Sequence, residues 1–317
     1  MRKLIALGIV VFFSVCAFAG DDYQQYARNY DYDRNAPLEA RNLNLKEQSN
    51  GVKTYDFDYA SLQGGRVPAY LVVPDGNGPF AAVVWGHWMK DGSPYKNRTE
   101  FLEEAQVLAK AGVVSLLIDT PMVRPDFKPD PNPLTPQDAM VVQQMVIDVR
   151  RGIDLLASRN DVDPKRIAFV GHSFDGGVAG ILSGVEPRLT AIVDMAGGLS
   201  DMDWFNSPAA EKWKKKVGAD NARKFLEDYT WTDPKHFVSH RGHAALLLQY
   251  ATHDEFITDK DAEGYLKFIP EPRELKVYDA DHALNGQARK DRVDWLREKL
   301  KFGAVDEAAL AKVTQIH

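Results

Sequence analysis

The sequence predicts an α/β fold with a mostly parallel central sheet and helices on both faces. Short apolar segments that suit strands alternate with longer segments of helical periodicity from about residue 80 to the C-terminal region. Two of the apolar segments, 80–86 (FAAVVWG) and 113–118 (VVSLLI), are nearly continuous, as expected for strands buried on both faces. Strands that alternate with helices in this way favour a parallel sheet between two helical layers.

The other expected elements follow along the chain. Two antiparallel strands, 53–59 and 66–73, are expected at one edge of the sheet. Thr135 and Pro136 are residue types preferred at the N-cap and the first position of a helix, which predicts a helix that runs to Ala157. Further helices are expected at 99–111 with Thr99 as N-cap, from about 173, at 287–301 and at 305–314, and further strands at 166–170, 190–195, 244–250 and 274–279.

The composition is that of a globular protein. The chain has 317 residues, a formal net charge of −6 and 44% hydrophobic residues, which excludes the disordered and collagen-like classes. Because basic residues are not in excess, no nucleic-acid partner is expected. The single cysteine, Cys16, excludes a disulfide scaffold and a cysteine-rich zinc site.

Residues 1–19 have the pattern of a secretory signal peptide. Arg2 and Lys3 precede an apolar run over 4–16, and small residues at the end of the segment predict cleavage near Ala19. The apolar run is shorter than the ~20 residues that a membrane-spanning helix needs. We therefore expect a periplasmic or secreted protein whose mature chain has no cysteine and no membrane span.

The mature chain is expected to form one domain. Residues 20–50 are polar and charged and are interpreted as a leader along the surface, and residues 51–317 as the domain itself. Within it, residues 199–242 lie between two expected strands and are too long for a simple crossover. We interpret this insertion as a small lid over the carboxyl ends of the strands.

The segment 171–177 (GHSFDGG) is the clearest sign of chemistry. It follows the strand at 166–170 directly and opens a helix. A serine hydroxyl needs a neighbouring base to become a nucleophile, and a sharp strand-to-helix turn exposes it. Small residues around Ser173 allow strand and helix to cross closely, and the helix N-terminus adds donors for an oxyanion. The segment is therefore interpreted as a nucleophile elbow, with a glycine-rich turn and a capping serine as the alternative.

Here the sequence resembles the α/β-hydrolase family. The segment RIAFVGHSFDGG is most similar to the dienelactone-hydrolase and bacterial esterase branch, and AYLVVPDGNGPFAAVVWGH is similar to the start of that branch. The resemblance covers roughly residues 50–300 and implies the α/β-hydrolase fold. The pattern G-x-S-x-G is matched at Gly171 and Ser173, but Asp175 stands at the last position. Because dienelactone hydrolases carry a cysteine nucleophile, the resemblance does not imply lactone specificity.

The resemblance implies that an acid and a histidine follow the serine in that order. Asp254 lies just beyond the strand at 244–250, and His282 lies in the loop after the strand at 274–279. In these roles Ser173 attacks an acyl carbon, His282 moves its proton, and Asp254 fixes the imidazole tautomer. Three other acids, Asp194, Glu255 and Asp281, are alternatives for the third member or neighbours that tune the site.

An oxyanion hole needs two backbone N–H donors near the serine. The first is expected from Phe174, the residue after the nucleophile. The family supplies the second from the loop after the strand at 80–86, and aligning Trp85-Gly86 with the family's HG-type turn makes His87 the better candidate and Trp88 the alternative.

Other histidines receive structural interpretations. His236, His240 and His243 have spacings that would suit a metal on one helix, but Pro234 and Gly242 make a continuous helix unfavourable. No metal and no cofactor are therefore expected. His172, next to the serine, is expected to pack or hydrogen-bond locally.

These observations predict an exported serine hydrolase that cleaves a small-molecule carboxylic ester through an acyl-serine intermediate. A serine peptidase of the same fold is the enzymatic alternative. The alternative from another class is a catalytically inactive binding protein of this fold, which Asp175 at the elbow favours most. The acyl group, the alcohol and the oligomeric state do not follow from the sequence.

Overall fold

The computed structural model describes residues 22–130, 135–205 and 210–317. The predicted signal peptide, residues 1–19, lies outside these residues. Among the helices that are described, none combines the length and the apolar character needed to cross a bilayer.

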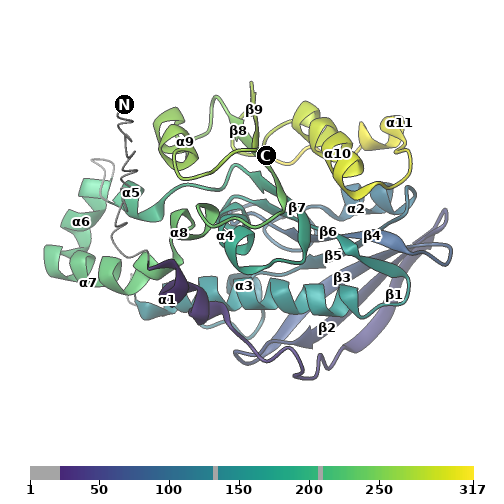
Figure 1. Ribbon diagram of the computed structural model, residues 1–317, viewed down its shortest axis with the longest axis horizontal. Coiled ribbons are helices and arrows are strands. Elements are labelled where there is room, and N and C mark those ends of the chain that lie inside the picture. The colour runs from purple at the N-terminus through teal and green to yellow at the C-terminus, as the bar shows by residue number, and fades with distance from the viewer. Residues whose placement is uncertain (1–21, 131–134, 206–209) are drawn as a thin grey trace, which may run out of the picture.

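A nine-stranded sheet forms the centre of the molecule (Figure 1). The strand order is β1-β2-β3-β5-β4-β6-β7-β8-β9. Strands β1 to β3 and β5 pair antiparallel, and all pairs from β5 through β9 are parallel. The predicted α/β fold with a mostly parallel sheet is confirmed. The strands are β1 Arg41–Ser49, β2 Val52–Ala60, β3 Arg66–Pro74, β4 Phe80–Gly86, β5 Val113–Ile118, β6 Val162–His172, β7 Leu189–Met195, β8 Ala245–Ala251 and β9 Glu274–Tyr278.

The sheet edge differs from the prediction, because three antiparallel strands form it and not two. The additional strand, β1, lies in the segment that was interpreted as a leader. Every residue of β1 is exposed, so the strand has no buried face and shows no apolar alternation in the sequence. Its pairing with β2 comes from backbone hydrogen bonds, which residue types do not encode. The leader is also anchored by Tyr30, whose side chain is fully buried.

Helices cover both faces of the sheet (Figure 1). On β4, Ala82 and Val84 join one hydrophobic core with α3 and α4, while Val83 and Trp85 join a second core with α2 and α10. This alternation is the period of two expected for a strand buried on both faces. The helices are α1 Tyr23–Ala27, α2 Leu102–Ala109, α3 Pro136–Ala157, α4 Phe174–Val185, α5 Asp201–Phe205, α6 Glu211–Val217, α7 Ala219–Tyr229, α8 Lys235–Val238, α9 Asp259–Leu266, α10 Gly286–Leu300 and α11 Glu307–Leu310.

The two predicted helix caps have different outcomes. Thr135 caps α3 in a capping box with Asp138, Pro136 follows at the first position, and the helix ends at Ala157 as predicted. The prediction for Thr99 is wrong, because α2 begins three residues later and its N-cap is Phe101. A turn precedes the helix instead, in which the Thr99 N–H donates to the Asn97 side chain at 2.9 Å.

The predicted insertion, residues 199–242, contains α5 to α8 and the short 3-10 helix η4, Thr230–Thr232. Helices α6 and α7 extend beyond one end of the sheet (Figure 1). Helix α8 packs against α4, and α7 packs against α3. The insertion is thereby joined to the two helices that flank the carboxyl end of β6.

A buried ion pair fixes the C-terminal helix that follows the His282 loop. Arg292 of α10 donates to both carboxylate oxygens of Glu104 on α2, at 3.1 and 2.6 Å, and also to Gln249 of β8 at 3.3 Å. Both charged side chains are almost fully buried. Since a bidentate pair of this kind restricts orientation as well as distance, it sets the position of α10 against the sheet.

Candidate active site

Ser173 forms the whole connection between β6, which ends at His172, and α4, which begins at Phe174. Its backbone angles are φ 57° and ψ −112°, a conformation that residues with a Cβ rarely adopt. The Ser173 N–H donates to the carbonyl of Met195 on the adjacent strand at 2.8 Å. This sharp turn places the serine at the carboxyl ends of the parallel strands, as a nucleophile elbow does.

A continuous chain of hydrogen bonds joins Ser173, His282 and Asp254. The Ser173 Oγ lies 2.8 Å from the His282 Nε2, and the His282 Nδ1 lies 2.8 Å from the Asp254 Oδ2. The side chains of the histidine and the aspartate are only 3% and 1% exposed. Because the Nδ1 proton is directed to Asp254, the Nε2 lone pair is available for the serine proton.

The environment of Asp254 favours the carboxylate form. Burial raises the pKa of Asp254, but hydrogen bonds from His282 and from the amides of Ile257 and Phe256 outweigh it and hold the pKa below its usual range. Those amides donate to Oδ1 at 2.9 and 2.8 Å, which leaves Oδ2 for the histidine. The loop after β8 thus presents an oriented, ionised acid.

The alternative acids are occupied elsewhere. Both oxygens of Asp194 accept the Gly198 N–H, at 2.9 and 3.0 Å. Glu255 pairs with Lys90 at 3.0 Å. Asp281 accepts the N–H of Ala283, two residues further on, at 3.0 Å. Of the four candidates, Asp254 is the acid that the structure brings to His282.

The predicted oxyanion donors need a correction on one side of the site. The Trp88 N–H donates to the Glu100 Oε2 at 2.7 Å and is therefore not available to a substrate. The His87 amide favours the charged form of the buried Asp175 carboxyl, but neither oxygen of that carboxyl has a hydrogen-bond partner in the described part of the chain. In the described part of the chain, neither Phe174 nor Met89 has an acceptor for its N–H. The residue types of this loop did not reveal which of its successive amides faces the serine.

Asp175 fits at the elbow because the neighbouring strand makes room for it. A Cβ on Gly86 of β4 would lie 2.6 Å from both the Cβ and the Oδ2 of Asp175. The aspartate side chain therefore occupies the space that any other residue at position 86 would need. Burial and the nearby charge of Glu100 raise the pKa of Asp175 well above its usual range, which favours the neutral form of this carboxyl.

Two further glycines permit the close crossing of strand and helix. A Cβ on Gly171 would lie 2.0 Å from the Asp175 carbonyl oxygen, and one on Gly176 would lie 2.4 Å from the Gly197 Cα. Gly171 thus serves the crossing of β6 and α4, while Gly176 serves the contact of α4 with the loop after β7. The second glycine of the G-x-S-x-G pattern is thus replaced by Asp175, and the glycine that packing requires comes one position later, at Gly176.

A cavity of about 270 Å³ adjoins Ser173 and His282. Its walls are mostly apolar, and no Asp, Glu, Lys or Arg is among the described residues that line it. Helix α4, the insertion and the loop after β8 supply the apolar wall residues Phe174, Val178, Ile181, Leu199, Phe256 and Ile257. The Phe256 ring packs edge-on against the His282 imidazole at 4.7 Å. A neutral apolar group bound in this cavity would reach the serine hydroxyl directly.

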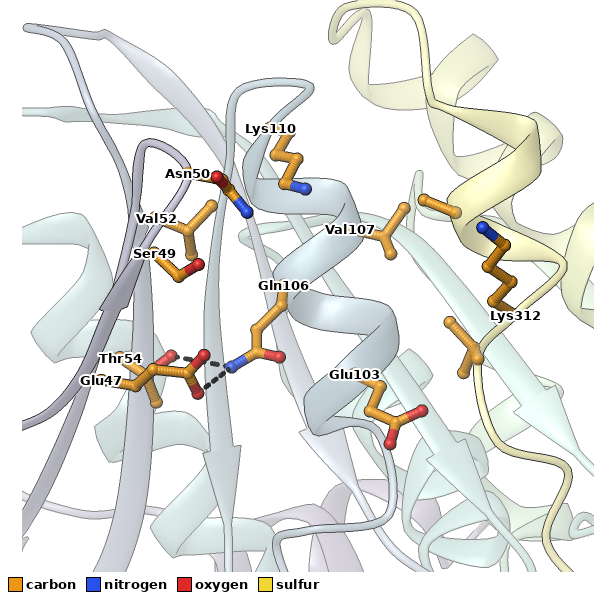
Figure 2. A pocket seen from close by; sticks show the side chains of 12 residues that line it. Glu47, Ser49, Asn50, Val52, Thr54, Glu103, Gln106, Val107, Lys110 and Lys312 are labelled. Carbon is orange, nitrogen blue, oxygen red and sulfur yellow. Dashed lines mark hydrogen bonds between the residues drawn. The ribbon is translucent and has the colours of Figure 1, made fainter.

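A second depression, of about 260 Å³, lies between β1, β2, α2 and the C-terminal segment (Figure 2). Its floor is polar, and the Gln106 amide donates to Glu47 at 3.0 Å and to Thr54 at 3.2 Å. Among the described residues that line it there is no histidine, and its Glu47 carboxylate already accepts the Gln106 amide, so no serine–histidine pair like that of Ser173 and His282 is found there.

The three histidines with metal-like spacing do not share a helix. His236 lies in α8, His240 follows the end of α8, and His243 lies just before β8. The His240 ring stacks on Tyr23 of α1 at 4.0 Å, and the His236 ring packs edge-on against Tyr26 at 4.9 Å. These two histidines therefore hold the N-terminal helix against α8.

One buried acid near the site was not predicted. The Glu100 carboxylate lies between Trp88 and His172, and His172 in turn contacts the carbonyl of His282. Glu100 is one charged residue in a polar stretch before α2, a context in which a solvated side chain is the ordinary expectation. Neither a motif nor a periodicity points to it.

Comparison with known proteins shows what the chain as a whole is similar to. No protein-family model matches the chain. The chain is 25% identical over 291 residues to 2,6-dihydropseudooxynicotine hydrolase of Paenarthrobacter nicotinovorans, which covers 88% of this chain and 75% of that protein. It is 23% identical over 303 residues to esterase EstD of Thermotoga maritima, which covers 83% of this chain and 68% of that protein.

Solved structures show the same fold. The acetyl xylan esterase of Paenibacillus sp. R4 superposes with a TM-score of 0.68 at 20% identity, over 89% of this chain and 95% of that one. A dienelactone hydrolase assigned in Klebsiella pneumoniae superposes with a TM-score of 0.56 at 18% identity, over 80% and 99%. The chain has the α/β-hydrolase fold, and its resemblance to hydrolases and esterases of this fold is confirmed. These similarities support an ester-cleaving hydrolase.

The packing of Gly86 against Asp175 predicts a compensating pair of substitutions. We expect Gly86→Ala to lower the free energy of unfolding by about 1–3 kcal/mol, because the new methyl group overpacks a buried contact. Asp175→Gly in the same chain should recover part of that loss, because it removes the group that the methyl meets. Urea unfolding of the wild type, both single variants and the double variant measures the coupling. Additive effects would contradict the packing argument.

Asp194 predicts a stability that falls with rising pH. Burial raises the pKa of Asp194 to about 7, against opposing hydrogen bonds from the amides of Gly198 and Gly197. Between about pH 4 and 7 the unfolded carboxyl is ionised and the folded one is protonated, so stability decreases by up to ~1.4 kcal/mol per pH unit. Below this window the full stability is present, and above it the loss is complete.

Asp194→Asn should remove this decline, since the amide does not titrate. Urea unfolding between pH 4 and 8 measures it, with the exposed Asp126→Asn as the control that should run parallel to the wild type. If the Asp194→Asn curve also runs parallel to the wild type, the folded carboxyl does not hold its proton.

Proposed function

We propose that this protein is an exported serine hydrolase that cleaves neutral carboxylic esters through an acyl-Ser173 intermediate. The single observation that carries the proposal is the hydrogen-bonded chain of Ser173, His282 and Asp254 at a strained strand-to-helix turn. It is supported by the relatives, whose names describe a hydrolase and an esterase.

The reaction follows from the positions of the groups. His282 Nε2 accepts the Ser173 proton while Oγ attacks the ester carbonyl carbon, and Asp254 stabilises the imidazolium that forms. The tetrahedral intermediate collapses, its bond to the alcohol oxygen breaks, and His282 returns the proton to that oxygen. Water then attacks the acyl-serine by the same route, which releases the carboxylic acid and restores the serine.

The oxyanion is assigned to two backbone donors. Phe174 N–H lies at the start of α4, where the helix dipole also favours negative charge. Met89 N–H is the second, because the preceding amide, of Trp88, is already bound by Glu100. Preorganised amides of this kind stabilise the charge that develops in the transition state without reorganising.

Two alternatives are less well supported. An inactive binding protein was favoured by Asp175 at the elbow, but Gly86 accommodates that side chain and Ser173 keeps its contact with His282. A peptidase would use the same triad, and the relatives named for ester cleavage favour the ester. Export to the periplasm or medium is proposed from the signal-like pattern of residues 1–19 alone.

The proposed nucleophile predicts covalent labelling. A fluorophosphonate probe should label the wild type at Ser173, and Ser173→Ala should abolish both the label and ester hydrolysis, with a loss of about 10⁴-fold or more. Asp254→Asn should reduce kcat by a similar factor, whereas Asp194→Asn, a matched change of a buried acid, should keep most of it. Mass spectrometry locates the label and an ester assay gives the rates. Folded wild type that takes no label and cleaves no ester would refute the proposal.

The cavity predicts preference for a neutral apolar acyl group. Across p-nitrophenyl esters of increasing chain length, kcat/KM should rise up to about 4-fold per methylene while the chain fills the cavity, since burying a CH₂ contributes ~0.8 kcal/mol. It should then fall once the walls are reached. An ester with a terminal carboxylate should react at least ~100-fold more slowly, because the walls offer no cation.

Leu199→Trp, which narrows the cavity, should move the optimum to a shorter chain. Leu62→Trp in the turn between β2 and β3 is the control and should leave the optimum unchanged. An optimum that is the same in both variants would show that the acyl chain binds elsewhere.

A further inference from the structure

A second hydrogen-bonded chain runs behind the first one. The Trp88 N–H donates to the Glu100 Oε2 at 2.7 Å, the Glu100 Oε1 lies 2.6 Å from the His172 Nδ1, and the His172 Nε2 lies 2.9 Å from the carbonyl oxygen of His282. This chain joins the loop after β4, the end of β6 and the loop after β9. Those three segments carry the proposed oxyanion donor, the nucleophile and the base.

The chain is almost fully buried. The side chains of Glu100 and His172 are 1% and 0% exposed, and Trp88 is fully buried. The Trp88 ring stacks on His172 at 5.2 Å and lies nearly parallel to His282 at 6.4 Å. Because these groups are almost fully buried, each hydrogen bond in this chain is strong and each loss is costly.

The geometry fixes most of the protons. A backbone carbonyl only accepts, so the His172 Nε2 must carry hydrogen. A backbone amide only donates, so the Glu100 Oε2 must accept. One further proton remains between the Glu100 Oε1 and the His172 Nδ1, and on either atom the pair as a whole has no net charge. A buried pair without net charge avoids the cost of an uncompensated ion.

We propose that Glu100 and His172 are positioning residues. They hold the loop after β4, which carries Met89, and the loop after β9, which carries His282, in their positions around Ser173. The inference rests on the proposed function. Glu100 fixes the Trp88 amide and thereby the direction of the next one, of Met89. His172 fixes the backbone carbonyl of His282, while Asp254 contacts the side chain of the same residue. Neither residue touches the substrate cavity.

Loss of this positioning should lower the rate strongly, because the reaction tolerates only a narrow range of positions for the catalytic groups. Displacing a catalytic group by about 1 Å costs on the order of 10²-fold in rate, even when the change is made away from the reacting atoms. Glu100→Ala removes two hydrogen bonds of the chain at once. We expect it to lower kcat by about 10- to 100-fold with KM changed by less than ~3-fold, because the cavity that binds the apolar group is untouched.

The isosteric variant separates position from charge. In Glu100→Gln the amide oxygen can accept the Trp88 N–H and the amide nitrogen can donate to the His172 Nδ1, so all three links remain. We expect this variant to keep kcat within ~3-fold of the wild type. Similarly, His172→Gln keeps a donor near the His282 carbonyl and should lose less than His172→Ala.

Glu186→Ala is the matched control for lost stability. Glu186 is a buried acid paired with Arg150 and Arg188 at the far end of α4 from Ser173. It should lower the melting temperature and leave kcat at 25 °C near the wild-type value. If Glu100→Ala behaves in the same way, with a lower melting temperature and an unchanged kcat, the positioning role is refuted and Glu100 is structural only.

A measurement on the resting protein gives a readout independent of turnover. In ¹⁵N-histidine-labelled wild type, the His282 Nδ1 proton that is shared with Asp254 should give a downfield resonance, and in Glu100→Ala it should broaden or disappear. The Glu100→Gln spectrum should resemble that of the wild type. His172→Ala, which also breaks the chain, should change the resonance as Glu100→Ala does, and it takes the place of Glu100→Ala if that variant does not fold. An unchanged resonance in the folded alanine variants overturns the proposal. Wild type that cleaves no ester but shows these spectral changes would instead refute the proposed function and leave the positioning role intact.

Discussion

The backbone conformation of Ser173 is the constraint on which the rest of the site depends. A residue with a Cβ at φ 57° and ψ −112° stores strain on the order of 1–3 kcal/mol, and it persists only where the surroundings hold it. Here the hydrogen bond to Met195 holds the backbone from the strand side, and the helix closes on the strand from the other. That closure requires Gly171, because a methyl group there would collide with the Asp175 carbonyl. The close packing of α4 on β6 therefore holds the proposed nucleophile, Ser173, in its position at the turn.

Two buried carboxyl groups near the elbow have pKa values that are shifted in opposite directions by their surroundings. Asp254 accepts two amides and an imidazole, and its pKa is held low. Asp175 lies near Glu100, and burial with that neighbouring charge raises its pKa well above the usual range. Two neighbouring buried carboxylates cannot both be ionised at modest cost, which favours the neutral form of Asp175. A neutral side chain allows an aspartate to replace the usual glycine at the elbow without adding a buried negative charge.

Sequence patterns predicted those features that depend on residue type and failed for those that depend on backbone direction. The apolar run of β4 and the capping residues of α3 could be interpreted directly, because burial and capping select residue types. Ser173, Asp254 and His282 could be placed at strand ends because their side chains carry the proposed chemistry. Strand β1 could not, since an edge strand exposed along its whole length has no apolar face. The second oxyanion donor could not be chosen between His87 and its alternative Trp88 by residue type, because every residue but proline has an N–H and only the fold decides where it points; the Trp88 N–H donates to Glu100.

The walls of the cavity connect the insertion to the chemistry. Helix α4 begins with the proposed donor Phe174 and continues with Val178 and Ile181. One rigid element therefore carries both a proposed oxyanion donor and part of the cavity lining. The insertion adds Leu199 to the lining of the same cavity, and no hydrogen bond joins Leu199 to Ser173, His282 or Asp254. A substitution in the insertion can therefore change the shape of the cavity, and so the group that fits it, without moving the side chains of the proposed triad. Because an apolar wall also lowers the local dielectric constant, it strengthens the attraction between the amides and a developing oxyanion. In the proposed reaction, the walls that select a neutral ester would thus also favour the charge that its cleavage creates.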